Sequence, residues 1–296
     1  MSRMKRSHTL SEAPDLPERP ARPLEIDGRQ DNGRQTGSPC QPLVSPSAPQ
    51  IRVLEEFAAA SPELLAARSL LSRVDTKCML AATTLEGVLE SLLDDYAILL
   101  ARGGGPARYR TLYLDTPQYR SLEDHHRGRR PRFKARIRHY PDRELSYLEV
   151  KEKTPANQTR KSRRRIPYGE ESLDPEGLQF LDDLLPVRAR DLVHTLRTEF
   201  ERITLLGHRT KERVTLDLNP AFTSPHDRAS FPAAVIVEVK QERFQPRSPF
   251  LMALRAHRIF PVSVSKYCTA AALLLPEVRM NGYRDTVRAL GRIGDE

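Results

Sequence analysis

Residues 132–138 read Arg-Phe-Lys-Ala-Arg-Ile-Arg, so a cation and an apolar side chain alternate at every step. Because successive side chains of a β-strand point to opposite faces, the pattern predicts a strand with four positive charges on one face. Phe133, Ala135 and Ile137 then form the opposite, packed face. Neighbouring cations on one face would lie about 7 Å apart, since a strand rises about 3.3 Å per residue, and they repel unless an anion lies between them. The stretch therefore predicts a β-sheet face that binds a polyanion.

The positive charge of the chain is concentrated around this stretch. The 296 residues carry a formal net charge of +9, whereas residues 127–165 alone hold fifteen Lys or Arg and four Asp or Glu. Such an excess indicates an acidic partner: nucleic acid, an anionic membrane surface, or a free phosphate polymer or nucleotide. Single-stranded nucleic acid usually stacks on aromatic side chains, and the chain has no Trp and 6% aromatic residues. Nucleic acid is therefore the weaker candidate.

The first fifty residues differ in composition from the rest of the chain. They contain eight of the 24 prolines, together with many Ser, Gln, Asp and Arg residues and little apolar periodicity. Such a segment buries too little apolar surface to offset the entropy lost on ordering. Residues 1–50 are therefore expected to form a disordered, Pro-rich extension, residues 51–280 the folded domain, and residues 281–296 a C-terminal tail.

The cysteines and the apolar segments of the sequence indicate in which cellular compartment the protein is expected. Cys40, Cys78 and Cys268 are too few and too scattered for a disulfide framework or a zinc site, which favours a reducing compartment. The sequence has neither the apolar segment of a signal peptide nor a run of about 18 apolar residues that could span a bilayer. We expect a cytoplasmic protein without a membrane span, and the sequence indicates no obligate protein partner.

The remaining pattern predicts mostly strands with helices at the flanks. Residues 85–100 have the apolar spacing of a helix, which stops at Gly103-Gly104-Gly105. Strands are expected at 109–114, 132–140, 145–151, 163–168, 199–206, 213–218 and 234–240, and further helices at 175–185, 249–258 and 265–275. Short links between strands favour an antiparallel α+β fold.

Charged residues of the predicted strands fall on shared faces, as Glu149, Lys151 and Lys153 do. If these faces pointed outward, they would form an ordinary basic surface. Closure of the sheet into a barrel would instead turn them toward a lumen and pack the apolar faces against outer helices. A lumen lined by cations and a few carboxylates would be a phosphate channel. Arg164 has the opposite parity to Arg163 and Arg165 and is expected to be solvated, and His125 and His126 are expected to be loop or packing residues.

Eight short motifs occur in order over about residues 70–275. They are Arg73-Val74-Asp75-Thr76-Lys77-Cys78, Tyr113-Leu114-Asp115-Thr116, residues 134–140, Leu148-Glu149-Val150-Lys151, Phe200-Glu201-Arg202, residues 213–217, Val237-Glu238-Val239-Lys240 and Ser265-Lys266-Tyr267-Cys268. Together they resemble the catalytic domain of the VTC (vacuolar transporter chaperone) family, part of the CYTH-like, triphosphate tunnel metalloenzyme superfamily. Each motif alone is weak, and the ordered series carries the resemblance.

The resemblance implies a triphosphate tunnel fold: an antiparallel β tunnel barrel with flanking helices. It also implies an enzyme that transfers the γ-phosphoryl group of ATP to a growing polyphosphate chain with Mg²⁺ or Mn²⁺. The catalytic cations carried over are Lys77, Arg136, Arg138, Lys151, Arg202 and Lys266, and Glu238 would bind the metal. Additional cations expected to contact ATP or polyphosphate are Lys134, Lys153, Arg163, Arg213 and Lys240. Phosphoryl transfer depends mainly on positioning and on neutralising phosphate charge, which these residue types supply.

One departure from the family pattern concerns the first strand. Hydrolytic relatives carry an acidic-x-acidic-x-Lys run, whereas Arg73 stands at the first acidic position here and only Asp75 and Lys77 are kept. Replacing a carboxylate by a cation disfavours activation of water by a second metal and favours a longer phosphate chain. Two alternatives stay open: a metal-dependent triphosphate hydrolase and a non-catalytic module that binds polyphosphate.

Overall fold

The computed structural model describes residues 51–70, 73–101, 104–156, 158–278 and 280–294. The extension expected over residues 1–50, with Cys40, lies outside these described residues. Helices in the described part are α1 (Pro62–Ala67), α2 (Ala82–Glu90), α3 (Arg120–His126), α4 (Pro175–Asp182), α5 (Pro249–Ala256), α6 (Lys266–Leu274) and α7 (Arg284–Gly294). Short 3-10 helices are η1 (Arg52–Glu55), η2 (Pro141–Arg143), η3 (Ala189–Asp191) and η4 (Asn281–Tyr283).

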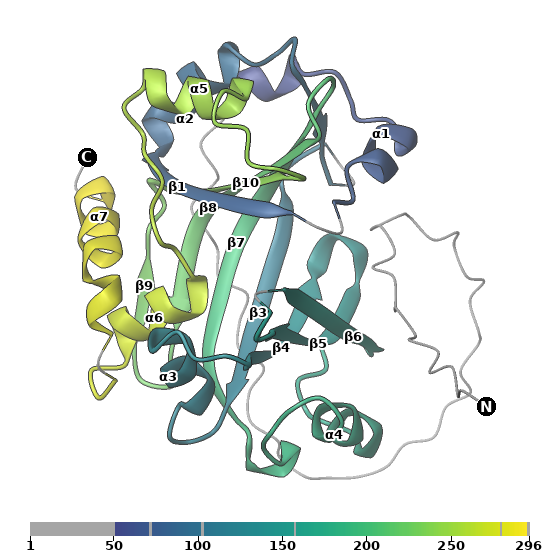
Figure 1. Cartoon of the computed structure of the whole chain (residues 1–296), viewed down its shortest axis with the longest axis vertical. Coiled ribbons are helices and arrows are strands. Elements are labelled where there is room, and N and C mark those ends of the chain that lie inside the picture. Colours follow the sequence, from purple (N-terminus) through teal and green to yellow (C-terminus); the bar gives the residue numbers. More distant parts are fainter. Residues whose placement is uncertain (1–50, 71–72, 102–103, 157, 279, 295–296) are drawn as a thin grey trace, which may run out of the picture.

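A ten-stranded antiparallel sheet forms the centre of the molecule (Figure 1). Its strands are β1 (Val74–Ala81), β2 (Tyr96–Leu99), β3 (Ala107–Asp115), β4 (Arg132–Tyr140), β5 (Leu145–Lys153), β6 (Thr159–Ile166), β7 (Val193–Gly207), β8 (Glu212–Thr223), β9 (Arg228–Ser230) and β10 (Ala234–Gln241). The main path runs β1-β10-β8-β7-β3-β4-β5-β6, while β2 pairs with β7 and β9 with β8. The predicted antiparallel α+β architecture is confirmed.

The outer face of the sheet is apolar and is covered by helices at two places. Helices α2 and α5 pack on β1, β10, β8 and β7 through a cluster that includes Leu85, Phe250 and Val237. Helix α4 packs on β3 to β6 through Leu181, Ile137 and neighbouring residues. Figure 1 shows these two helix groups at opposite ends of the molecule. Alternation along each strand therefore places the apolar side chains outside and leaves the charged ones on the inner face.

Part of the inner face is apolar as well, and helices α3, α6 and α7 lie against it. Met79 of β1 and Ile236 of β10 belong to a buried cluster with Tyr267 of α6 and Leu290 of α7. Because Met79 has the same parity as Lys77, the inner face changes from apolar to charged along one strand. The charged section is therefore bounded by the packed helices.

The sheet curls without closing. Within the described residues, its path ends at β1 and β6, which do not pair with each other. One short segment nevertheless contacts both sides of the inner face: Val264 O accepts from Lys77 Nζ of β1, and Ser265 Oγ accepts from Lys134 Nζ of β4, each at 3.0 Å. The fold therefore differs from a hydrogen-bonded barrel by an open seam between β1 and β6.

Two segments differ from the expectations. The helix predicted over 85–100 ends at Glu90, and β2 pairs with β7 instead, Tyr96 lying opposite Gly207. Residues 281–296, expected to be a tail, contain η4 and α7. His125 and His126, expected to be loop or packing residues, lie in helix α3.

Candidate active site

The decisive stretch 132–138 forms strand β4, as predicted. Ala135 and Ile137 are buried on the outer side, whereas Lys134, Arg136 and Arg138 are half-buried on the inner side. The alternation arises because apolar groups favour the helix-covered face and charged groups need solvent or a partner. Sequence pattern alone thus gives the direction of these side chains.

Strand register aligns the neighbouring cations and one carboxylate. Across β4, β5 and β6, Arg136 lies opposite Glu149, and Glu149 lies opposite Arg163. In the adjacent row, Lys134 lies opposite Lys151, which lies opposite Lys161. Lys161 was not among the predicted site residues, although its parity with Arg163 would have indicated it.

Glu149 is the buried centre of the first cluster. It accepts a hydrogen bond from Arg136 Nε at 2.7 Å, and Lys161 Nζ lies 2.6 Å from its other carboxylate oxygen. Desolvation by burial raises the pKa of Glu149, but the charges of Arg136, Arg138 and Lys161 outweigh it and hold that pKa well below its usual range. Glu149 is therefore an ionised anchor that fixes two cations.

Asp217 on β8 is the centre of a second cluster. It accepts hydrogen bonds from Arg202 Nε at 2.5 Å and Arg202 Nη2 at 2.8 Å, and it also binds Lys266 at the start of α6. Desolvation raises the pKa of Asp217, but Arg202 and Lys266 outweigh it and set that pKa at about 2. The Lys266 ammonium also lies 4.5 Å from the centre of the Phe200 ring. Two of the predicted catalytic cations are thus held by one buried carboxylate.

Glu238 on β10 lies between two lysines. Its carboxylate is 2.7 Å from Lys240 Nζ and 3.7 Å from Lys77 Nζ, and Lys240 also donates to Thr215 Oγ1 at 3.1 Å. Burial opposes ionisation, but Lys240 and Lys77 hold the pKa of Glu238 well below its usual range. The structure therefore gives Glu238 ion-pair partners in addition to the metal role carried over from the family.

Within the described residues, no group of three or more His, Cys, Asp or Glu side chains could hold a metal ion. Glu238 can supply one oxygen ligand, since 21% of its side chain is exposed on the inner face. Mg²⁺ commonly binds one or two carboxylates together with substrate phosphates and water. The site therefore fits a metal ion that arrives with a phosphate substrate rather than a metal ion held by the protein alone.

Lys134 and Lys151 differ from the other cations. Lys134 Nζ donates to Ser265 Oγ at 3.0 Å and lies 3.4 Å from His125 Nε2 and 3.9 Å from Cys268 Sγ. In the part of the chain that the structure describes, neither lysine has a carboxylate within 4 Å. Desolvation, reinforced by the charge of Lys77, lowers the pKa of each to about 8. These two adjacent charges are left for a bound anion to neutralise.

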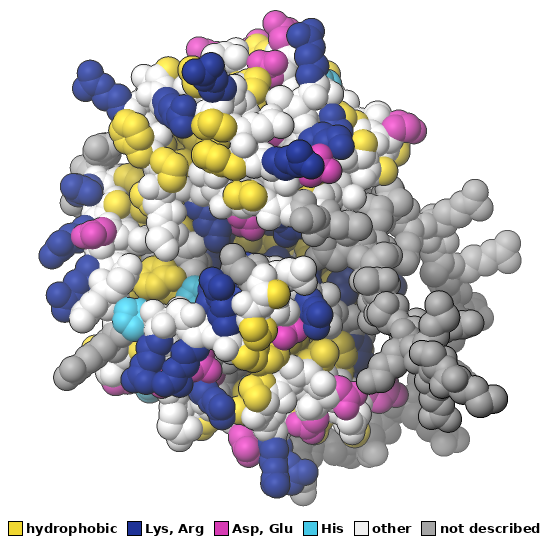
Figure 2. Space-filling model, viewed as in Figure 1, with side chains coloured by type: hydrophobic (Ala, Val, Ile, Leu, Met, Phe, Trp, Pro, Cys, Tyr) yellow, Lys and Arg dark blue, Asp and Glu magenta, His cyan; other side chains and the backbone are white. Residues whose placement is uncertain are grey.

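Lys151 also reveals the shape of the site. Its side chain is exposed to solvent, yet surrounding protein desolvates it strongly. Both observations hold for a side chain on the wall of a concavity that is open to solvent. Figure 2 shows basic and acidic side chains in a recess across the middle of the molecule.

The other predicted residues lie on the same sheet face or at its rim. Arg138 donates to Thr111 Oγ1 at 3.1 Å, and its guanidinium is 5.6 Å from the Tyr109 ring centre. Arg163 is exposed and lies 4.9 Å from the Tyr147 ring centre. Register places Lys153 opposite Arg132 and Arg213 opposite Lys240.

Arg164 points away from the inner face and is partly exposed, as expected, but it is also ion-paired. It lies on the outer side and donates to both carboxylate oxygens of Asp174, at 3.0 and 3.1 Å, and to Glu176. Asp174 is the N-cap of α4 and accepts a hydrogen bond from Gly177 N. Arg164 of β6 therefore links this strand to α4 through two carboxylates, that of the N-cap residue Asp174 and that of Glu176 in the first turn.

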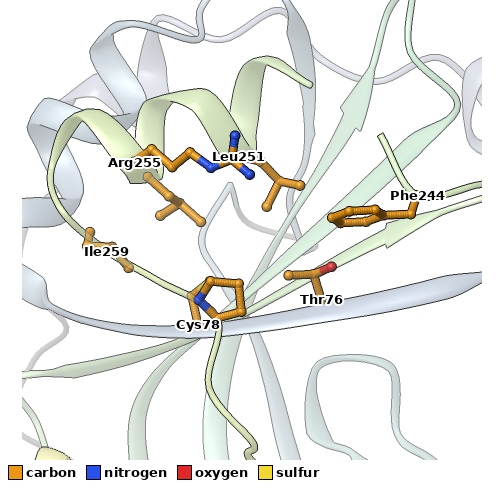
Figure 3. A pocket seen from close by; sticks show the side chains of 8 residues that line it. Thr76, Cys78, Phe244, Leu251, Arg255 and Ile259 are labelled. Atoms are coloured by element: carbon orange, nitrogen blue, oxygen red, sulfur yellow. The ribbon is translucent and has the colours of Figure 1, made fainter. Parts of the chain in front are cut away.

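A small apolar pocket lies on the opposite side of β1 from Lys77. Thr76 and Cys78 of β1 line it on one side (Figure 3). The other lining residues include Phe244 between β10 and α5, Leu251 of α5 and Ile259 after α5. Its lining lacks the lysines and carboxylates of the inner face. The pocket is therefore separate from the charged site.

Several solved structures resemble the chain. They include an adenylate cyclase candidate from Bacillus halodurans, at 14% identity and a TM-score of 0.42, covering 66% of this chain and 94% of that chain. An adenylyl cyclase candidate from Hippeastrum, described as having a dominant triphosphatase activity, has 15% identity and a TM-score of 0.44 and covers 69% and 98%. A third, from Vibrio parahaemolyticus, has 9% identity and a TM-score of 0.41 and covers 66% and 95%.

Two further findings concern sequence relatives and membrane-spanning helices. No curated protein sequence gives a significant match. None of the helices within the described residues is long and apolar enough to cross a bilayer.

The family comparison covers the site itself. The VTC domain matches residues 72–275, a span that contains every inner-face cation and carboxylate described above. This match extends over more than half of the sequence. The chain therefore belongs to the VTC domain family.

Proposed function

We propose that the chain transfers the γ-phosphoryl group of ATP to a growing polyphosphate chain held on the basic inner face. Family membership supports a polyphosphate- or triphosphate-related function. Convergence of cations from β1, β4, β5, β7 and α6 on one face supports a substrate with several linked phosphates, because one phosphate could not neutralise them all.

In this proposal, the carboxylate-bound cations pre-organise the site. Arg136 is fixed by Glu149, and Arg202 and Lys266 are fixed by Asp217. Donors held in place before the reaction stabilise the charge of the transferring phosphoryl group without reorganising. Lys134 and Lys151 would supply the charge that binds the rest of the phosphate chain. A metal ion bound to Glu238 and substrate oxygens would neutralise further phosphate charge.

One observation favours transfer to phosphate over transfer to water. Glu149, Asp217 and Glu238 each bind cations, and the pKa of each is lowered, so each is a weak base. Attack by water requires removal of a proton, whereas the terminal oxygen of a polyphosphate chain is already anionic. The inner face is therefore better suited to a phosphate acceptor.

Incubation of the purified protein with ATP labelled in the γ-phosphate and Mn²⁺ tests this proposal. The expected product is a labelled polymer much longer than ATP, resolved by gel electrophoresis. Accumulation of free phosphate without polymer would identify a triphosphate hydrolase instead. Tight binding of polyphosphate with neither product would identify a binding module.

A further inference from the structure

The C-terminal segment 281–294 lies beyond the residues that the VTC domain matches, yet it reaches the inner face. Tyr283 of η4 places its hydroxyl 3.2 Å from His125 Nε2 of α3. The same nitrogen lies 3.4 Å from Lys134 Nζ of β4. A chain of polar contacts therefore links the C-terminal segment to one of the two uncompensated lysines.

The protonation of these groups fixes the direction of the contacts. Burial, together with the charges of Lys134, Arg132, Lys77 and Lys151, lowers the pKa of His125 to about 2, so the imidazole is neutral. An ammonium can only donate, so His125 Nε2 must accept from Lys134. Burial raises the pKa of Tyr283, which therefore stays a hydroxyl. The single lone pair of Nε2 is then shared between this hydroxyl and the ammonium, which fits the long distances of 3.2 and 3.4 Å. The imidazole proton then resides on Nδ1.

Three groups therefore contact the Lys134 ammonium, none of them a carboxylate: Ser265 Oγ, His125 Nε2 and Cys268 Sγ. These contacts fix the position of the ammonium, but no carboxylate balances its positive charge. Lys266, in contrast, is bound directly by Asp217. Lys134 is the better placed of the two to attract an anion.

The segment that carries Tyr283 is firmly docked. Tyr283 is buried, Thr286 Oγ1 donates to Ser263 O at 2.9 Å, and Leu290 is fully buried among residues of α6 and the sheet. Ser263 precedes α6, whose N-cap is Ser265. Residues 263–265 therefore contact both α7, through Ser263 O, and the Lys134 ammonium, through Ser265 Oγ.

We propose that Tyr283, acting through His125, positions Lys134 beside Lys151 as a subsite for a phosphate group, so that segment 281–294 completes the anion-binding face. The inference rests on the proposed function in taking the anion to be a linked phosphate. Tyr283 and His125 are positioning residues, and Lys134 contacts the anion.

The test measures binding of inorganic tripolyphosphate by calorimetry, without ATP or metal. Tyr283→Phe removes the hydroxyl that contacts the His125 ring, so the ring and the Lys134 ammonium beside it are held less firmly and the Kd should rise about fivefold. Tyr119→Phe is the matched control, because it removes an exposed hydroxyl bonded to Glu277 at 3.0 Å. That control should bind like the unaltered protein.

A double-mutant cycle separates positioning from a general structural effect. In a Lys134→Met background, Tyr283→Phe should cause no further loss of affinity, because the group it positions is gone. An equal loss in both backgrounds, or no loss in either, overturns the inference. If Tyr283→Phe does not fold, His125→Gln and His125→Leu replace it: Gln keeps an acceptor and should retain affinity, whereas Leu should lose about fivefold.

The pH profile provides a second readout. The charged and titratable groups facing Lys134 are Lys77 of β1, Arg132 and Arg136 of β4, His125, Cys268 and Tyr283, with Lys151 opposite. Affinity for tripolyphosphate should fall above pH 8 in the unaltered protein and less steeply in Tyr283→Phe. An identical slope in both proteins contradicts the inference. Absence of tripolyphosphate binding by the unaltered protein would instead reject the proposed function.

Discussion

The Asp217 cluster and the Lys134–Lys151 pair use positive charge in opposite ways. Arg202 and Lys266 share one buried carboxylate, so their positions are fixed and half of their combined charge is balanced. Lys134 and Lys151 lie opposite each other on β4 and β5, and no carboxylate lies within 4 Å of either in the described residues. Like charges directly opposite across two strands destabilise a sheet. The first region therefore stabilises the fold, whereas the second retains repulsion that an anion can relieve.

The largest expected effect tests the stabilising half of this comparison. Asp217→Asn keeps the shape of the side chain but leaves the half-buried cations Arg202 and Lys266 without their carboxylate. Breaking a buried ion pair by removing one partner costs about 3 kcal/mol or more, so the free energy of unfolding should fall by about that amount in urea titrations. A loss below about 1 kcal/mol would show that the cluster is not a structural anchor.

The next effect concerns catalysis. Arg138→Ala removes a cation that bonds to a hydroxyl, and Glu149 keeps both of its ion-pair partners, Arg136 and Lys161. Loss of one donor to the transferring phosphoryl group should lower the rate of polymer formation about 100-fold with an unchanged unfolding midpoint. Arg136→Ala should also abolish synthesis, but it leaves Glu149 with fewer cations and should destabilise the fold too. Undiminished polymer formation by Arg138→Ala would remove that residue from the site.

A smaller effect should appear with pH, and its sign differs between binding and stability. The pKa of Lys134 and Lys151 falls from about 10.5 in the unfolded chain to about 8 in the folded one. Between these values the unfolded chain binds more protons, so these two groups make stability rise with pH from about 8 to 10.5. Affinity for tripolyphosphate should instead fall roughly tenfold across pH 8, because the bound anion needs the charged lysines. Parallel trends in the two measurements would contradict the assignment of uncompensated charge.

The smallest effect is expected on the outer face. Arg164→Ala removes a partly exposed ion pair with Asp174 and Glu176, which should cost less than about 1 kcal/mol. Polymer formation should be unchanged, since Arg164 lies on the side of β6 away from the other cations. A large fall in activity would mean that the position of α4 controls the inner face.

Strict alternation made much of the sheet predictable from sequence. The pattern of residues 132–138 gave both the existence of β4 and the direction of its side chains, because one face needs apolar packing and the other needs a charged environment. The same reasoning failed at Tyr96–Leu99, four apolar residues that suit a helix or a buried strand equally well. Pairing with β7, a long-range contact, decides between them.

Contacts between distant elements limited the prediction of the site. The alternation of side chains along a strand would have predicted Lys161 as a site residue, because it shares the inner face with Arg163 two positions away. No local pattern, however, indicates that Tyr283 meets His125, because the contact joins residues 158 positions apart. Ion-pair partners such as Asp217 for Lys266 likewise depend on the docking of α6.

The seam between β1 and β6 has a mechanical consequence. In a closed barrel, strand number and stagger fix the diameter, since every strand is bonded on both sides. Here the backbone of β1 is met at Lys77 O by Val262 N, from the segment before α6, rather than by β6. No ladder of backbone hydrogen bonds therefore fixes the distance between β1 and β6 across the seam. Anions bound on the inner face would relieve the repulsion between Lys77 and Lys151, so they should bring the two edges closer together.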